Sequence, residues 1–184
     1  MKLRVGLIGC GRISQMHAIP ISLRDDVEFV AVCDNKEDRA IEMAKQYNCA
    51  HYTDYQNMFD NEQLDVIHIC LPHNLHAPVA IEAANRKIHV LTEKPMSITL
   101  EDAGEMINKA KENNVTLGVI FQTRYNQASQ LIKSMLENGE LGNIKAGKAS
   151  VTWDRSDQYY QESDWKGTWD KEGGGVIICG CINY

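Results

Sequence analysis

Short apolar runs alternate with longer segments in which apolar residues recur every three or four positions, from the N-terminus to Phe121. This pattern is typical of strands followed by amphipathic helices. The apolar runs lie at 3–8, 27–33, 66–71, 88–91 and 115–121, and the helix-like segments lie at 12–23, 36–47, 74–86 and 99–113. Strands that alternate with helices form βαβ units, so we expect an α/β fold with a doubly wound parallel sheet.

Local signals mark some of the helix ends. Pro20 bends or ends the first helix, because proline has no amide proton and clashes with the preceding turn. Asn74 and Thr99 are suited as N-caps, since their side-chain oxygens accept hydrogen bonds from backbone amides. Glu101 and Asp102 fall in the first turn after Thr99, where the helix dipole favours anions. We expect the two helices to begin at these caps.

The alternation changes after Phe121. A helix is expected over 128–137, stopped by Asn138-Gly139, and a strand over 145–153. A polar stretch that contains tryptophans follows from 154 to 170. Residues 122–184 hold too few elements for a core of their own. We therefore expect them to be the beginning of a second, incomplete domain.

Composition and charge restrict the possible partners. The 184-residue chain is 43% hydrophobic and 24% charged, as is ordinary for a globular protein. Its net charge of −6 argues against a nucleic-acid partner, which would require a basic surplus. No apolar run approaches the ~20 residues of a membrane-spanning helix, and the N-terminal sequence lacks the pattern of a signal peptide. We expect a cytoplasmic protein with no membrane partner, whose cysteines are free thiols.

The segment Gly9-Cys10-Gly11-Arg12-Ile13-Ser14 follows the first strand and opens the first helix. In the dinucleotide fingerprint the first glycine permits the tight turn and the second lets the backbone approach a pyrophosphate. A third small residue lets helix and strand pack closely, and here Ser14 stands where glycine or alanine is usual. We expect a dinucleotide to bind at Gly9, Gly11, Arg12, Ile13 and Ser14, against the helix N-terminus.

Asp34 ends the second apolar run, at about the 20-residue distance expected for a carboxylate that binds a ribose 2′-hydroxyl. Without this carboxylate, the glycine segment would read equally well as a tight turn in another α/β protein. A carboxylate repels a 2′-phosphate, so the sequence favours NAD over NADP. Lys36 is a nearby cation of the kind that holds such a phosphate, which leaves NADP as the less favoured cofactor.

Three further motifs follow the predicted strands. They are L-P-H-N-L-H-A-P at 71–78, E-K-P at 93–95 and G-V-I-F-Q-T-R-Y-N at 118–126. Together with the glycine segment, and in this order, they make the chain resemble the glucose–fructose oxidoreductase / inositol dehydrogenase / MocA (Gfo/Idh/MocA) family. The resemblance runs from residue 2 to about residue 178.

The resemblance implies an NAD(P)-binding Rossmann domain over residues 1–121 and the start of an α/β substrate domain over 122–184. That second domain often forms a subunit interface, so a homo-oligomer through the C-terminal region is expected. The implied activity is that of an NAD(P)-dependent oxidoreductase, a dehydrogenase that transfers a hydride between the nicotinamide and a sugar, cyclitol or related polyol.

The resemblance also assigns individual residues. Lys94 becomes the catalytic residue that reaches the substrate hydroxyl, and the proline after it, Pro95, is usually cis. Without the resemblance, Lys94 would read as an exposed loop lysine at the end of a strand. The remaining assignments are cofactor contacts at Pro72, Asn74, His76, Glu93 and Lys94 and substrate contacts at Arg124 and Tyr125.

The chain departs from the family's pattern near its C-terminal end. The family carries an Asp or Asn, and four residues later a His that serves many members as general acid or base. Those positions hold Cys179 and Asn183 here, and asparagine does not exchange a proton near neutral pH. We expect a truncated, impaired family member. The alternative is a non-catalytic NAD-binding protein that retains only the nucleotide-binding half.

Several histidines and tryptophans are consistent either with ligand binding or with packing in the core. His73 and His76 have a metal-like spacing, but no further cluster supplies the ligands that zinc requires, and we expect no metal. His68 and His89 fall in predicted strands, where hydrogen-bonded core histidines are expected. Stacking on a sugar ring and packing in a core are equally consistent with Trp153, Trp165 and Trp169.

Overall fold

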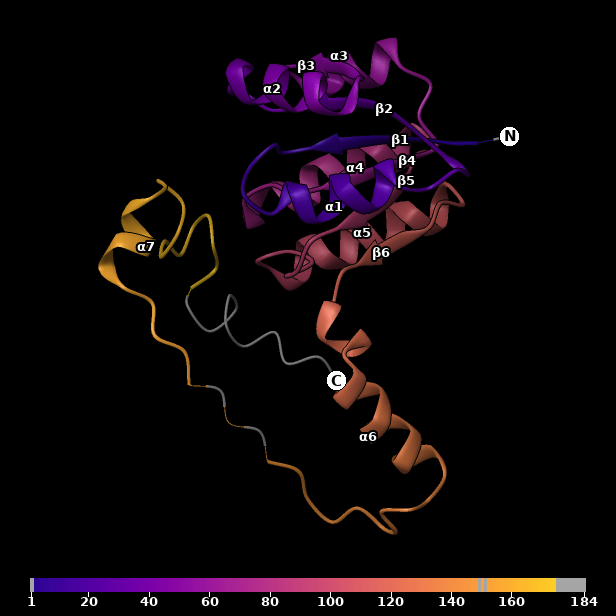
Figure 1. Cartoon of the computed structure of the whole chain (residues 1–184), viewed down its shortest axis with the longest axis vertical. Coiled ribbons are helices and arrows are strands. Elements are labelled where there is room, and N and C mark those ends of the chain that lie inside the picture. Colours follow the sequence, from indigo (N-terminus) through magenta and orange to yellow (C-terminus); the bar gives the residue numbers. More distant parts are fainter. Residues whose placement is uncertain (1, 149, 151, 175–184) are drawn as a thin grey trace.

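Six strands form a single parallel sheet (Figure 1). The computed structural model describes residues 2–148, 150 and 152–174. The strand order is β3-β2-β1-β4-β5-β6, and each neighbouring pair is parallel. The strands are β1 (Leu3–Ile8), β2 (Val27–Cys33), β3 (Ala50–Tyr52), β4 (Val66–Ile69), β5 (His89–Thr92) and β6 (Leu117–Val119). The expected doubly wound α/β sheet is confirmed.

Helices connect the strands and cover both faces of the sheet (Figure 1). The α-helices are α1 (Ser14–Ser22), α2 (Glu37–Tyr47), α3 (Tyr55–Asn61), α4 (His76–Asn85), α5 (Leu100–Glu112), α6 (Gln127–Glu137) and α7 (Asp157–Gln161). Two short 3₁₀ helices are η1 (His73–Leu75) and η2 (Gln122–Tyr125). Pro20 lies in the last turn of α1. Among the helices in the described ranges, none is long and apolar enough to cross a membrane.

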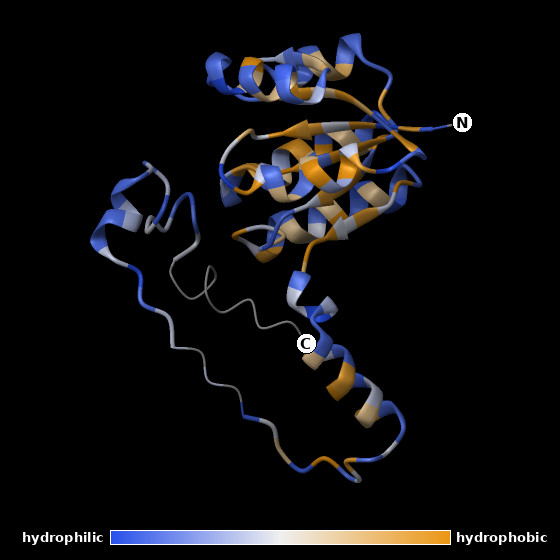
Figure 2. Ribbon diagram, in the orientation of Figure 1, coloured by the Kyte–Doolittle hydropathy of each residue, from blue (hydrophilic) through white to orange (hydrophobic). Residues whose placement is uncertain are grey.

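Two apolar clusters explain why the strands are apolar almost throughout. Val5 and Leu7 of β1 pack with α1 and α2 on one face of the sheet, while Ile8 packs with residues of α3, α4 and α5 on the other. Side chains alternate between the two faces along a strand, so a strand buried on both faces cannot show a polar side. Figure 2 shows the hydrophobic residues gathered along these strands.

The structure confirms one of the two predicted N-caps and contradicts the other. The Thr99 hydroxyl accepts a hydrogen bond from the Asp102 amide at 3.1 Å and caps α5, as expected. Asn74 does not cap α4, and that prediction is wrong. The chain first turns through η1, and the N-cap residue of α4 is Leu75. Asn74 lies inside that 3₁₀ turn and lacks the extended conformation of an N-cap.

Two short elements are invisible in the apolar pattern. β3 pairs with β2 at the edge of the sheet and has only three residues. α3 follows it, and the Asp54 carboxylate caps this helix by accepting hydrogen bonds from the amides of Gln56 and Asn57. Both elements are too short for a periodic signal, although Asp54 is a recognisable cap residue.

The chain beyond β6 is organised differently. α6 matches the helix expected over 128–137, but it buries none of its residues, and Leu131, Ile132 and Leu136 are exposed. Figure 1 shows α6 leading away from the sheet before the chain returns toward it. The strand expected over 145–153 is not present in the described residues of that segment. A strand requires a hydrogen-bonded neighbour, and within the described ranges no strand follows β6 to supply one.

The Thr99 cap gives a test of the fold. The substitution Thr99→Ala should lower the free energy of unfolding by about 1 kcal/mol, because the Asp102 amide then loses its acceptor. Urea unfolding followed by circular dichroism measures the change. Thr53→Ala, at an exposed position outside any helix, is the matched control. Equal losses in the two variants would contradict the assignment of Thr99 as a cap.

Candidate functional site

The carboxyl ends of four parallel strands meet at one edge of the sheet and carry most of the candidate residues. The glycine segment follows β1, Asp34 follows β2, the segment 70–76 follows β4, and Glu93 follows β5. β1 lies between β2 and β4, and the strand order reverses direction at this point. In doubly wound sheets, ligands bind in the crevice outside the strand ends at such a reversal.

The turn after β1 requires glycine at position 9. Gly9 has a φ of 97°, and its amide donates a hydrogen bond to the Cys33 carbonyl at 2.7 Å. A Cβ at this position would lie 2.4 Å from the carbonyl oxygen of Cys70. At Gly11, by contrast, a Cβ would have nothing within 4 Å. Gly9 therefore serves the turn itself, and Gly11 leaves open space where a ligand can approach the backbone.

Ser14 shows how the third position of the fingerprint accepts serine. Its side chain is fully buried, and its hydroxyl donates to the carbonyl of Gly11, one turn earlier. The hydroxyl thereby satisfies its own hydrogen bond without reaching toward the sheet. Arg12 and Ile13 are exposed at the start of α1, beside this turn. The start of α1 thus presents the helix N-terminus that binds anions in dinucleotide folds.

Asp34 links the glycine turn to the turn after β2. It is 8% exposed, its Oδ2 accepts from the Cys10 amide at 2.8 Å, and its Oδ1 accepts from the Lys36 amide at 2.8 Å. Each carboxylate oxygen has more than one lone pair, so both keep capacity to accept from a ligand hydroxyl. The carboxylate therefore holds the loop and keeps capacity for a further hydrogen bond.

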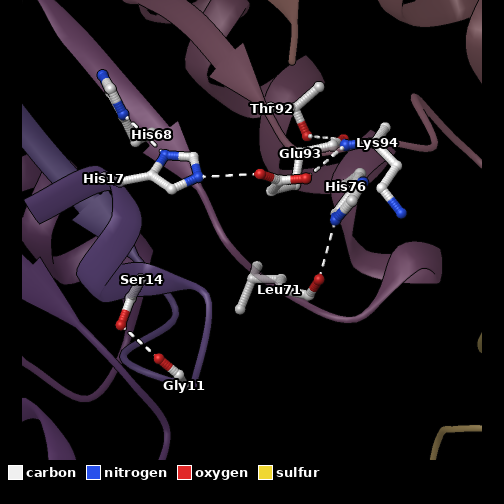
Figure 3. A network of polar contacts seen from close by, with 9 residues as sticks. All are labelled: Gly11, Ser14, His17, His68, Leu71, His76, Thr92, Glu93 and Lys94. Carbon is white, nitrogen blue, oxygen red and sulfur yellow. Dashed lines mark hydrogen bonds and ion pairs between the residues drawn. The ribbon is translucent and has the colours of Figure 1, made fainter. Parts of the chain in front are cut away.

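Glu93 and Lys94 form the turn after β5 (Figure 3). The Glu93 carboxylate lies between two donors, with Oε1 3.1 Å from His17 Nε2 and Oε2 accepting from the Lys94 amide at 3.1 Å. Burial alone would raise the pKa of Glu93, but His17 and the Lys94 amide outweigh it and hold this pKa below its usual value. The Lys94–Pro95 peptide bond is cis, in agreement with the resemblance.

His76 is fully buried. Its Nδ1 lies 2.8 Å from the carbonyl oxygen of Pro95, and its Nε2 lies 2.9 Å from that of Leu71. Burial lowers the pKa of this imidazole, against the opposing effect of the two carbonyls. The ring joins the turns after β4 and β5. The cofactor contact expected for His76 from the sequence stays a prediction. Pro72 is half-buried at the start of η1.

The segment around 165–172 returns to this edge of the sheet. The Asn74 amide donates to the Lys171 carbonyl at 3.0 Å, and His73 Nδ1 lies 2.9 Å from the Glu172 carbonyl oxygen. The His73 ring also packs edge-on against Trp165, with ring centroids 5.1 Å apart. Burial lowers the pKa of His73 to about 4, so its imidazole is neutral at pH 7.

These contacts bring Glu172 to the site, a residue to which the sequence assigned no role. Its side chain is fully buried, and its Oε2 accepts from the Gly167 amide. Burial raises the pKa of Glu172, opposed by the Gly167 amide and the charges of Lys166 and Lys94. Within the described residues, Glu172 Oε1 and Asn74 Oδ1 are buried without a hydrogen-bond partner. The only signal in the sequence was that Glu172 precedes three glycines.

These features fit a dinucleotide. The open space at Gly11 suits a pyrophosphate, and the buried acceptors of Glu172 and Asn74 lack donors that ribose or carboxamide groups supply. No group of three His, Cys, Asp or Glu side chains in the described part of the chain could hold a metal ion. Arg124 and Tyr125 lie in η2 beyond β6, where Arg124 stacks over Phe121 and Tyr125 is exposed.

Comparison with known proteins points in the same direction. A family profile described as "Oxidoreductase family, NAD-binding Rossmann fold" matches residues 3–121. The myo-inositol 2-dehydrogenase of Thermotoga maritima is 33% identical over 141 residues, which cover 76% of this chain and 42% of that protein. The D-glucoside 3-dehydrogenase of Escherichia coli is 34% identical over 144 residues, covering 77% and 41% respectively.

A solved structure matches more of the chain. The crystal structure of the WlbA dehydrogenase from Bordetella pertussis, in complex with NADH and UDP-GlcNAcA, superimposes with a TM-score of 0.92 at 33% identity. The match covers 96% of this chain and 51% of that one. The chain therefore spans about half the length, or less, of the proteins it matches.

The two glycines provide a matched pair of variants. Gly9→Ala should lower the free energy of unfolding by about 1–3 kcal/mol, because it combines positive φ with a clash against Cys70. Gly11→Ala should leave stability nearly unchanged but weaken NADH binding, because a methyl group then occupies the open space. Thermal unfolding and NADH fluorescence titration separate the two effects. Full NADH affinity in Gly11→Ala would show that the pyrophosphate does not approach this residue.

Proposed function

The chain belongs to the Gfo/Idh/MocA oxidoreductase family, with its NAD-binding Rossmann fold, and on this basis we propose that it binds NAD(H) for hydride transfer to or from a sugar, cyclitol or related polyol. The observation that carries the proposal is the convergence of two turns at one sheet edge. The glycine turn follows β1, and the Lys94 turn follows β5, so a cofactor bound at the first extends toward the second.

Each residue of the site has a distinct task in this proposal. Gly11 and the start of α1 bind the pyrophosphate, and Asp34 accepts the hydroxyls of the adenosine ribose. Asn74 and Glu172 supply acceptors near the other end of the cofactor. Bound NAD⁺ supplies the hydride acceptor. Lys94 hydrogen-bonds the substrate oxygen. In oxidation its neutral amine takes the hydroxyl proton as the hydride leaves, and in reduction its ammonium group gives that proton to the oxygen, which gains charge as the hydride arrives.

The proposal assigns the two parts of the chain separate roles. Residues 1–121 bind the cofactor, and residues 122–184 begin the substrate domain, in which Arg124 and Tyr125 contact the substrate. Relatives with 33–34% identity are named for myo-inositol and D-glucosides, and the structure with the 0.92 TM-score contains UDP-GlcNAcA. The common chemistry is a ring that bears secondary hydroxyl groups, and we propose this substrate class for the present chain.

A second candidate is a non-catalytic NAD-binding protein. It is favoured by the sequence at Cys179 and Asn183, where the family resemblance expects an Asp or Asn and a proton-transferring His. Both positions lie outside the described residues. Neither candidate changes the nucleotide site, so only turnover distinguishes them.

Cofactor preference tests the nucleotide site. NADH should bind more tightly than NADPH, because the Asp34 carboxylate accepts ribose hydroxyls and repels a 2′-phosphate. Asp34→Ala should weaken NADH binding by about tenfold or more, the effect of losing a hydrogen bond to a charged group, and should narrow or reverse the preference. Asp38→Ala, on the exposed side of α2, is the control. Equal affinities for the two cofactors in the unmodified protein would refute the assignment.

Turnover tests the catalytic part of the proposal. NADH formation is measured with NAD⁺ and a panel of inositols and glucosides. If the chain is active, Lys94→Ala should lower kcat by about 10²-fold or more, a typical effect of removing a group that stabilises or protonates the reacting atoms. Lys45→Ala, at an exposed position of α2, should leave the rate unchanged. NADH binding without turnover on any substrate would select the non-catalytic candidate.

A further inference from the structure

A network of buried polar contacts leads to the backbone of Lys94 and includes side chains from three different elements (Figure 3). His68 of β4 and His17 of α1 face each other with their Nδ1 atoms 3.0 Å apart. His17 Nε2 lies 3.1 Å from Glu93 Oε1 at the end of β5. His17 is 5% exposed, and the Glu93 side chain is 12% exposed. The contacts are therefore largely shielded from water.

The proton positions in this network of contacts follow from the hydrogen-bonding chemistry of its side chains. A carboxylate only accepts hydrogen bonds, so His17 Nε2 carries a proton and donates to Glu93. If His17 is neutral, its Nδ1 accepts, and His68 donates from Nδ1. If His17 is cationic, its Nδ1 donates, and His68 accepts at Nδ1. Burial and the neighbouring His17 lower the pKa of His68 to about 4, which keeps His68 neutral at pH 7 in both cases.

The second oxygen of Glu93 connects the network to the backbone of Lys94. Oε2 accepts from the Lys94 amide at 3.1 Å, while the Glu93 amide itself donates to the Ile69 carbonyl at 3.0 Å. On the other side of Lys94, the carbonyl of Pro95 lies against His76 at 2.8 Å. The backbone on both sides of Lys94 is thus held by side chains, one of which depends on His17.

His17 also connects this turn to the cofactor turn. It lies on α1 one turn after Ser14, whose hydroxyl closes the glycine turn on Gly11. A displacement of α1 would therefore move the glycine turn and the support of Glu93 together. The same helix sets the position of the pyrophosphate site and of the residue that touches the substrate oxygen.

We propose that His17 is a positioning residue for Lys94, which it holds through the Glu93 carboxylate at a fixed place relative to the glycine turn. The catalytic importance of Lys94 rests on the proposed function. The contacts of Glu93 with His17 and with the Lys94 amide do not depend on it. Loss of the His17 donor leaves one oxygen of the largely buried Glu93 carboxylate without a partner. The carboxylate then reorients to regain one, which releases the Lys94 amide.

The proton positions are tested on the unmodified protein. Long-range ¹H–¹⁵N correlation spectra of the histidine side chains report which ring nitrogens carry protons. The expected result is a protonated Nε2 on His17 and a neutral ring on His68. A His17 ring without a proton on Nε2 would overturn the proposal, because no donor would then reach Glu93.

Amide hydrogen exchange tests the positioning itself. In His17→Ala the Lys94 amide should exchange about tenfold faster, the equivalent of losing one hydrogen bond to a charged acceptor. His17→Gln keeps a side-chain N–H donor and should restore most of the protection. His51→Ala removes an exposed histidine outside the contacts and is the control. The Asp102 amide, bonded to Thr99, reports within each sample whether the fold has loosened as a whole.

Two outcomes would reject the proposal. One is Lys94 exchange that is unchanged in His17→Ala while the protein remains folded. The other is equal acceleration at Lys94 and Asp102 in both His17 variants, which would indicate a general role in stability. NADH titration of the same samples reports separately on the proposed function, since a protein that fails to bind NADH still yields the exchange result.

Discussion

The parallel pairing of β1 with both β2 and β4 is the constraint on which the site depends. It brings the carboxyl ends of all these strands to one edge and sends their helices to opposite faces, so that the turns after them converge. Gly9, Asp34 and Glu93 are distant in sequence, and they lie at the same edge of the sheet because the strands that precede them are parallel. The hydrogen bonds that fix the turns continue two parallel ladders beyond the strands: Gly9 to Cys33 extends the β1–β2 pair, and Glu93 to Ile69 extends the β4–β5 pair.

The sequence was informative wherever one physical requirement determined one residue type. Gly9 must be glycine because of its φ and its closeness to Cys70, and the apolar strands must be apolar because both faces are buried. Lys94 meets no such requirement, and its expected role comes only from the family motif. The cis bond at Pro95 agrees with that motif.

Other features depend on contacts that no local pattern records. His76 and His17 each bond to groups many positions away, and a sequence alone does not show that a ring is enclosed by two carbonyls or lies against a carboxylate. Glu172 lies near the turn after β4 because residues near 165–172 return to the sheet edge, where they contact His73 and Asn74. The strand expected over 145–153 was wrong in its described residues for a related reason, since an apolar alternation indicates a strand only where a neighbour exists.

The two hydrogen bonds that Asp34 accepts from backbone amides have a consequence for how cofactor choice in such a chain can evolve or be engineered. The carboxylate that we propose discriminates against a 2′-phosphate also braces the loop, and its removal leaves the amides of Cys10 and Lys36 without their acceptor. Specificity and loop geometry are therefore coupled at one residue. The Lys36 side chain, by contrast, is exposed and contributes only its amide to the brace. Substitutions that favour NADP therefore disturb the loop less at position 36 and at the exposed residues after it than at Asp34.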